Sequence, residues 1–152
     1  MVAIIPARID SSRFPAKMIA DATGKPLIQY AWEVAKKAYS VTDVYIATDS
    51  EEIADRVRQF GGEVIMTGEH PNGTSRIAQA VQDLDCDFVV NMQGDEPELD
   101  PRVIDTTIEI IGESVMATAA CVLQEDEIAN VNVVKALVEG DFAVDFSRQA
   151  EK

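Results

Sequence analysis

Short apolar runs alternate along this chain with segments whose apolar residues recur at helical spacing. The runs are short enough for strands, and each intervening segment repeats its apolar positions every three to four residues, as an amphipathic helix does. Strands separated by helices join in parallel through crossovers, and helices then cover both faces of the sheet. The sequence therefore predicts an α/β fold with a doubly wound, mostly parallel sheet.

The expected strands are Val2–Ile5, Val44–Ala47, Val64–Met66, Phe88–Asn91 and a longer β-prone run, Val115–Val122. The expected helices are Pro26–Ala38, a segment capped by Ser50 that runs through Phe60, Thr74–Leu84, and a last one from Pro101 to near Gly112. Val131–Val138 and Phe142–Phe146 are expected to pair as a hairpin around Gly140.

The composition excludes some classes of partner. The net charge is -14, whereas nucleic acids and anionic membranes bind basic surfaces, so we expect neither as a partner. No apolar run approaches the ~20 residues that span a bilayer, and we expect no signal peptide before the first strand. Cys86 and Cys121 fit no metal-ligand spacing, so we expect two buried, reduced thiols and a cytoplasmic location.

Three cations and two hydroxyls gather directly after the first strand. Between Val2–Ile5 and the first helix lie Arg8, Arg13 and Lys17, with Ser11 and Ser12. Open α/β sheets bind ligands outside the carboxyl ends of their strands. Arginine forks and a lysine charge suit phosphate oxygens, so this loop predicts a polyphosphate site.

The segment Gln93–Pro97 follows the fourth strand and carries Asp95. Gly94 allows a tight turn that would aim Asp95 outward. Mg²⁺ takes one or two carboxylates together with phosphate oxygens and water, so Asp95 and the basic loop could form a Mg-nucleotide site. Turn chemistry alone explains Asp95 about equally well, and Glu96 reads as its solvated neighbour.

Other polar residues lie at strand ends with weaker signals. For Asp49, local capping and turn bonds are favoured over a ligand role. Arg76 falls in the first turn of a helix, where a cation opposes the dipole, so we expect a bound anion or a carboxylate partner. The turn at Gly73 and Thr74 can present its backbone to a flat base, but it also reads as an ordinary capping turn.

Taken together and in order, these segments resemble the 3-deoxy-manno-octulosonate cytidylyltransferase family, which activates an acidic sugar with CTP. The segments that carry the resemblance are Ile5–Lys17, Gly24–Gln29, Ala47–Asp49, Phe60–Gly62, Gly73–Arg76, Asn91–Pro97, Asn132–Lys135 and Phe146–Arg148. The chain departs from the family at Ala16, where glycine is usual, at Ser75, where aspartate is usual, and at Asp145, where an aromatic is usual.

The resemblance implies a nucleotide-diphospho-sugar transferase-like fold and a distribution of roles. Arg8, Ser12, Arg13 and Lys17 would hold the CTP phosphates, with Lys17 and Asp95 as the catalytic residues. Asp95 would bind Mg²⁺. The remaining positions would contact the base (Pro6, Ala7, Gly73, Thr74) and the sugar acid (Gln93, Arg148).

The resemblance also implies the reaction. The CMP moiety of CTP would pass to 3-deoxy-manno-octulosonate with release of pyrophosphate, for lipopolysaccharide synthesis, in a protein that is a homodimer at full length. A cytidylyltransferase for another acidic or amino sugar, and a non-catalytic nucleotide-binding module, remain alternatives. Residues 1–152 would be a single nucleotide-binding domain that is truncated at the carboxyl end relative to the family.

Overall fold

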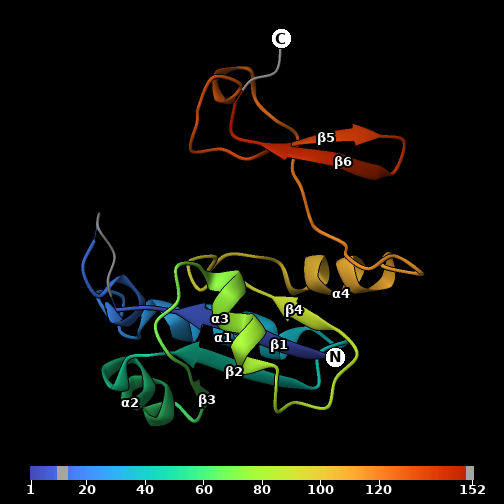
Figure 1. The fold of residues 1–152 in the computed structure, drawn as a ribbon. Helices are drawn as coiled ribbons and strands as arrows, with labels where there is room; N and C mark the ends of the chain where they lie inside the picture. The colour runs from blue at the N-terminus through green and yellow to red at the C-terminus, as the bar shows by residue number, and fades with distance from the viewer. Residues whose placement is uncertain (10–13, 150–152) are drawn as a thin grey trace. The chain divides into compact units, whose positions relative to one another are not determined.

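The computed structural model describes residues 1–9 and 14–149. The chain divides into two compact units, Met1–Ala117 and Thr118–Lys152. The first unit contains a four-stranded sheet and the second a two-stranded sheet (Figure 1). Each unit is described by itself.

The sheet of the first unit consists of β1 (Val2–Ala7), β2 (Asp43–Thr48), β3 (Glu63–Met66) and β4 (Val89–Asn91). Its strand order is β3-β2-β1-β4, and all neighbours pair in parallel, which confirms the expected sheet. The chain moves outward from β1 to β3 and then returns to add β4 on the other side of β1. The strand order therefore reverses between β1 and β4, the position where open α/β sheets bind ligands.

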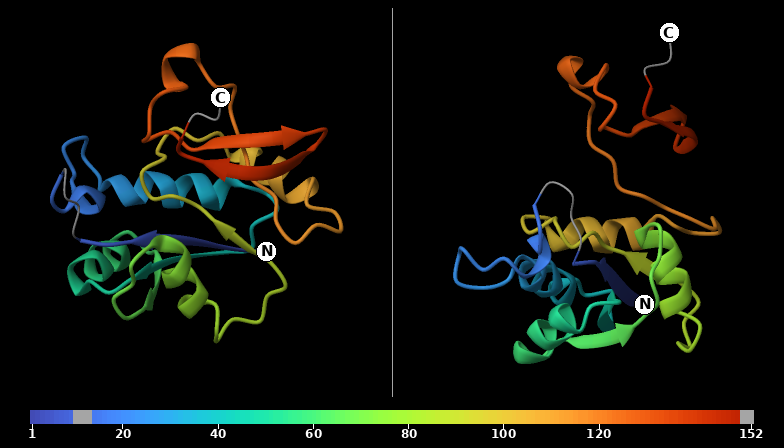
Figure 2. Two further views of the ribbon diagram at one scale, coloured as in Figure 1. Left: turned by 45° about the horizontal axis from the view of Figure 1, so that its top comes forward. Right: turned by 60° about the vertical axis from the view of Figure 1, so that its left-hand side comes forward.

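Helices cover both faces of this sheet, as the alternation predicts (Figure 2). Alternate residues of β1 point to opposite faces, so that Ile5 belongs to one apolar cluster and Ile4 to the other. The helices α1 (Leu27–Lys37), α2 (Glu51–Gln59) and α4 (Pro101–Glu109) contribute to the cluster of Ile5. Helix α3 (Gly73–Ala80) contributes to the cluster of Ile4.

Side-chain caps fix where three of these helices begin. Ser50, Asn72 and Asp100 each accept a hydrogen bond from a backbone N–H in the first turn of α2, α3 and α4. Helix α3 ends at Ala80, earlier than the sequence pattern indicates. Among the helices that the structure describes, none combines the length and apolar character that a membrane crossing requires.

The second unit contains the antiparallel hairpin of β5 (Lys135–Glu139) and β6 (Phe142–Ser147). Gly140 in the connecting turn has a φ of 60°, which glycine adopts without steric cost. The hairpin confirms the prediction, although β5 begins at Lys135 and not at Val131.

The expected strand Val115–Val122 is wrong. This run has no regular secondary structure, and Val115 and Val122 are 96% and 83% exposed. A β-prone run becomes a strand only where a neighbouring strand supplies hydrogen bonds, and no such pairing occurs for it among the described residues. Cys121 in this run is exposed and Cys86 is half-buried, so the expectation of two buried thiols is also wrong.

Candidate active site

The segments that follow all four parallel strands lie at one edge of the sheet, because parallel strands present their carboxyl ends on the same side. Arg8 follows β1, Asp49 follows β2, and Asp95 lies four residues after β4. Gly73 begins α3, which comes after β3. These strand-end residues therefore lie along one edge of the sheet, as a parallel sheet requires.

Lys17 and Asp95 meet at this edge. The Lys17 Nζ lies 2.8 Å from Asp95 Oδ2, and the two side chains are 39% and 42% exposed. An ion pair this exposed contributes at most about 1 kcal/mol to folding stability, so its importance lies in placement. The contact joins the loop after β1 to the loop after β4, where the strand order reverses.

The backbone before Lys17 is bent by an unusual residue. Ala16 has a φ of 54° and a ψ of 28°, the left-handed conformation that glycine adopts most easily. Its N–H donates to the Ile9 carbonyl at 3.2 Å, and its own carbonyl accepts from the Ile19 N–H at 3.0 Å. The conformation thus closes the loop on one side and starts the 3₁₀ turn η1 (Lys17–Ile19) on the other.

The turn that carries Asp95 packs closely against β1 and η1. A Cβ added to Gly94 would lie 3.1 Å from Met18 Sδ and 3.3 Å from Ile5 Cγ2. Gly94 lies in a turn, as expected, but it does not have a positive φ, so the close packing and not the backbone conformation favours glycine here. A side chain at this position would press against Met18 and Ile5, so glycine favours the close approach of this turn to η1 and β1.

The turn before α3 packs against the end of β1. A Cβ added to Gly73 would lie 3.0 Å from Pro6 Cγ. Asn72 Oδ1 accepts from the Ser75 N–H at 2.8 Å, and Ser75 Oγ donates to the Asn72 carbonyl at 3.0 Å. Thr74 is exposed beside them. The predicted base-binding residues Pro6, Gly73 and Thr74 are therefore close together.

Arg76 has a carboxylate partner, one of the two outcomes expected for it. Its Nη2 donates to Asp49 Oδ2 at 2.8 Å. Burial raises the pKa of Asp49, but the hydrogen bond and charge of Arg76 outweigh burial and hold this pKa below its ordinary value. Ser50 and not Asp49 caps α2, and the Asp49 side chain binds Arg76, a distant partner that the local capping and turn bonds expected from sequence did not include.

Sequence reasoning missed a second partner of Arg76. Thr67 Oγ1 accepts from Arg76 Nη1 at 2.6 Å. The position of Thr67 could have indicated this contact, because Thr67 directly follows β3 just as Asp49 directly follows β2.

The other predicted ligand residues have varied surroundings. Ala7 is buried, Arg8 is exposed, and the Gln93 side-chain amide donates to Asn91 Oδ1 at 3.3 Å. Ser12 and Arg13 lie outside the described residues. Arg148 belongs to the second unit, where its Nη1 donates to the Asn132 and Val131 carbonyls at 2.9 and 3.4 Å.

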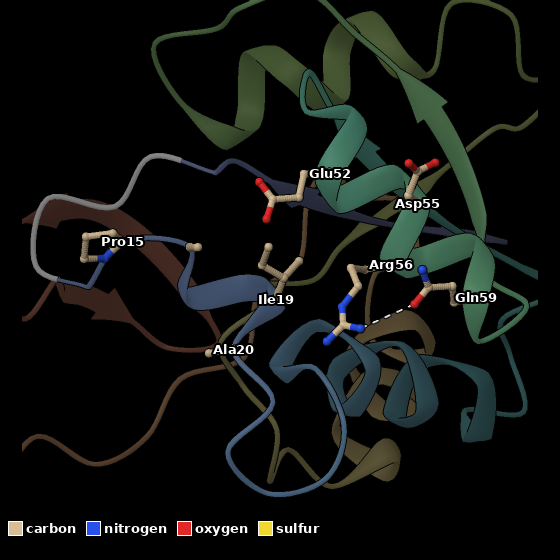
Figure 3. A pocket seen from close by; sticks show the side chains of 8 residues that line it. Pro15, Ile19, Ala20, Glu52, Asp55, Arg56 and Gln59 are labelled. Atoms are coloured by element: carbon tan, nitrogen blue, oxygen red, sulfur yellow. Dashed lines mark hydrogen bonds between the residues drawn. The ribbon is translucent and has the colours of Figure 1, made fainter.

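A hollow of about 630 Å³ lies between η1 and α2 (Figure 3). Arg56, one of its lining residues, already binds Asp21 at 2.6 Å. Of the predicted ligand residues that the structure describes, none lines the hollow, which is formed by Pro15, Ala16, Ile19, Ala20, Glu52, Asp55, Arg56 and Gln59.

The acidic side chains near the carboxyl edge of the sheet indicate how this edge could hold Mg²⁺. The described residues contain no group of three or more acidic, histidine or cysteine side chains gathered as a cation cage. Mg²⁺ in nucleotide sites needs only one or two protein carboxylates, because phosphates and water supply the other ligands. Asp95 offers one half-exposed carboxylate, which already attracts the Lys17 ammonium. The donor set fits a magnesium ion carried in by a nucleotide.

Comparisons with known proteins agree with this arrangement. Residues 2–151 match the family model described as cytidylyltransferase. The chain is 41% identical, over 97% of its length, to the 3-deoxy-manno-octulosonate cytidylyltransferase of Trichlorobacter lovleyi. It is 43% identical, over 95% of its length, to the 8-amino-3,8-dideoxy-manno-octulosonate cytidylyltransferase of Shewanella piezotolerans.

A solved structure is similar as well. It is that of CMP:2-keto-3-deoxy-manno-octonic acid synthetase complexed with CTP, with a TM-score of 0.88 and 34% identity over 98% of this chain. The chain spans 61% and 63% of the two curated relatives and 64% of the solved chain. These matches, together with the strand-end segments that carry the resemblance, show that the chain belongs to the cytidylyltransferase family.

Proposed function

We propose that the protein transfers the CMP moiety of CTP to 3-deoxy-manno-octulosonate and releases pyrophosphate, a step that activates the sugar for lipopolysaccharide synthesis. The observation that carries the proposal is the 2.8 Å contact between Lys17 and Asp95 where the strand order reverses. It brings a cation suited to phosphate and a carboxylate suited to Mg²⁺ to one point.

The reaction would be an in-line attack of the sugar's anomeric hydroxyl on the α-phosphorus of CTP. The protein's contribution is to position the reactants and to stabilise charge. Lys17 would exchange Asp95 for phosphate oxygens, and Arg8, Ser12 and Arg13 would add donors from the same loop. Pro6, Ala7, Gly73 and Thr74 would enclose the base, and Gln93 and Arg148 would bind the sugar acid. Magnesium held by Asp95 would neutralise phosphate charge and lower the pKa of the attacking hydroxyl.

A homodimer and a cytoplasmic location belong to the same proposal. Exposed apolar side chains on β6, Phe142 and Val144 among them, support association with a second copy. The use of CTP, an intracellular metabolite, supports the location.

The activity is tested by pyrophosphate release from CTP with Mg²⁺ and a panel of sugar acids, with ATP, GTP and UTP as controls. We expect release with CTP and 3-deoxy-manno-octulosonate, and background release with the other nucleotides. The assay should include the protein at the length of its curated relatives, since the present chain spans 61% of one of them.

A second acceptor deserves the same assay, because the Shewanella piezotolerans relative is named for the 8-amino sugar at 43% identity. Faster turnover with the 8-amino sugar than with 3-deoxy-manno-octulosonate would identify the 8-amino sugar as the acceptor. CTP binding without pyrophosphate release in the presence of any acceptor would contradict the enzymatic function and favour a non-catalytic nucleotide-binding module.

A further inference from the structure

The buried guanidinium of Arg76 binds parts of the chain that are distant in sequence. Arg76 is 3% exposed. Its Nη2 donates to Asp49 Oδ2 at 2.8 Å, and its Nη1 donates to Thr67 Oγ1 at 2.6 Å and to the Gly68 carbonyl at 3.4 Å. These acceptors follow β2 and β3, while Arg76 itself lies in the first turn of α3. One side chain therefore ties the start of α3 to the ends of two strands.

The chemistry of arginine suits this arrangement. Its planar fork can donate to a carboxylate and a hydroxyl at once, which a lysine ammonium at the end of a flexible stem does less well. A buried charge is tolerated only when paired and hydrogen-bonded, and both conditions hold here. With its donors directed at these partners and its surface covered, Arg76 is not available to touch a ligand at the edge of the sheet.

Two further contacts hold the same helix. The Gln79 Oε1 accepts from the Gly68 N–H at 2.9 Å, one turn further along α3. At the start of α3, Gly73 lies so close to Pro6 that an added Cβ would be 3.0 Å from Pro6 Cγ. Arg76 lies three residues after Gly73 in the first turn of α3, so a change in its contacts should shift the Gly73–Thr74 turn relative to Pro6.

We propose, on the basis of the function above, that Arg76 is a positioning residue for the nucleotide base. Through Asp49 and Thr67 it holds the Gly73–Thr74 turn against Pro6, so that the base-binding surface is formed before the nucleotide arrives. Lys17 lies on a different loop, and its contact with Asp95 involves none of these residues. Loss of the Arg76 contacts should therefore weaken binding of the base and spare binding of the phosphates.

The test compares two ligands by isothermal titration at fixed salt. CTP reports base and phosphate binding together, and inorganic tripolyphosphate reports phosphate binding alone. Arg76→Gln should weaken CTP binding on the order of tenfold and change tripolyphosphate binding by less than about twofold. Arg76→Lys, which keeps the charge near Asp49, should fall between Arg76→Gln and the wild type. The matched control is Arg102→Gln, because Arg102 pairs with Asp100 at an 88% exposed position and should leave both ligands unaffected.

Two additional variants guard against misfolding, since Arg76→Gln leaves the Asp49 carboxylate without its charged partner. Thr67→Val keeps the side-chain shape and removes one acceptor. The double variant Asp49→Asn/Arg76→Gln replaces the ion pair with two neutral amides. Both should show a cooperative thermal transition and the same selective loss of CTP affinity.

Equal weakening of both ligands in these folded variants, or unchanged CTP affinity, would overturn the positioning role while leaving the proposed function intact. A wild-type protein that binds CTP no more tightly than tripolyphosphate would overturn both the positioning role and the proposed function.

Discussion

At the scale of single residues, a strained backbone position, Ala16, directly precedes a charged residue of the candidate site, Lys17. Ala16 adopts a left-handed conformation that costs about 1–2 kcal/mol for a residue with a Cβ. Lys17 extends from that bend to within 2.8 Å of Asp95. A strained residue thus directs a charged one to the edge of the sheet.

Replacing Ala16 tests that strain. Ala16→Gly should raise the free energy of unfolding by up to about 1 kcal/mol, because relief of strain exceeds the entropy cost of glycine. Ala16→Val should lower it by about 1 kcal/mol or more, because a β-branched residue tolerates a positive φ poorly. Urea titration of both variants decides, and equal destabilisation by glycine and valine would contradict the strain at this position.

Lys17→Ala should weaken CTP binding by about 1.5–3 kcal/mol, the range for a hydrogen bond to a charged group. The control is Lys36→Ala, an exposed lysine in the last turn of α1. Isothermal titration at fixed salt measures both. If the two variants bind CTP alike, Lys17 is an ordinary surface charge.

At the scale of elements, close contacts and an ion pair with a buried arginine join the segments at the carboxyl ends of the strands. Gly94 and Gly73 let their turns approach β1, and Asp49 with Arg76 connects β2 to α3. These contacts place loops from different parts of the sequence on one edge, and substitutions there should change both stability and geometry.

Gly94→Ala should lower the free energy of unfolding by about 1–3 kcal/mol, the usual cost of adding volume to a packed site. The added methyl group would meet Ile5 and Met18, whereas at Gly68 the nearest atom would lie 3.8 Å away. Gly68→Ala is therefore the control, and chemical denaturation of both should separate them. Comparable stability of the two variants would show that Met18 moves aside without cost.

The Asp49–Arg76 pair should make stability depend on pH in acid. The pKa of Asp49 is lowered in the folded protein, so its contribution is present above the ordinary value of 3.8 and is lost as pH falls through the folded pKa. Between about pH 5 and pH 3 the wild type should thus lose more stability than Asp49→Asn. Urea midpoints across this range measure the difference, and parallel curves would mean that the pKa of Asp49 is not lowered by folding.

At the scale of the whole molecule, the two units differ in how they hide apolar surface. The first encloses apolar clusters on both faces of its sheet. In the second, Phe142, Val144 and Phe146 of β6 are 67%, 55% and 44% exposed. Apolar side chains gathered on a hairpin favour association with other chains, even in a chain with a net charge of -14.

Val144→Lys should therefore reduce self-association of this chain without weakening CTP binding, because the substitution leaves the first unit unchanged. Sedimentation velocity over a range of concentrations measures association, and Lys36→Ala again serves as a surface control. A wild-type chain that sediments as a monomer at every concentration would contradict this prediction.

The sequence by itself determined what depends on local pattern. Hydrophobic periodicity and turn residues predict the four parallel strands, the helices between them and the hairpin. These signals can be read from sequence because each acts over a few neighbouring positions. Because parallel strands end at one edge of the sheet, the order of the elements is enough to predict that Arg8, Gly73 and Asp95 lie along the same edge.

Features that depend on contacts between distant residues could be identified only from the tertiary structure. The position of Arg76 in a helix predicts an anionic partner, but 27 residues separate it from Asp49, and no local sequence pattern identifies that pairing. Gly94 is needed because Ile5 and Met18 pack against it. Val115–Val122 has strand-like residues but no strand beside it among the described residues, so its backbone remains irregular. In each case a local preference was settled by contacts that only the folded chain supplies.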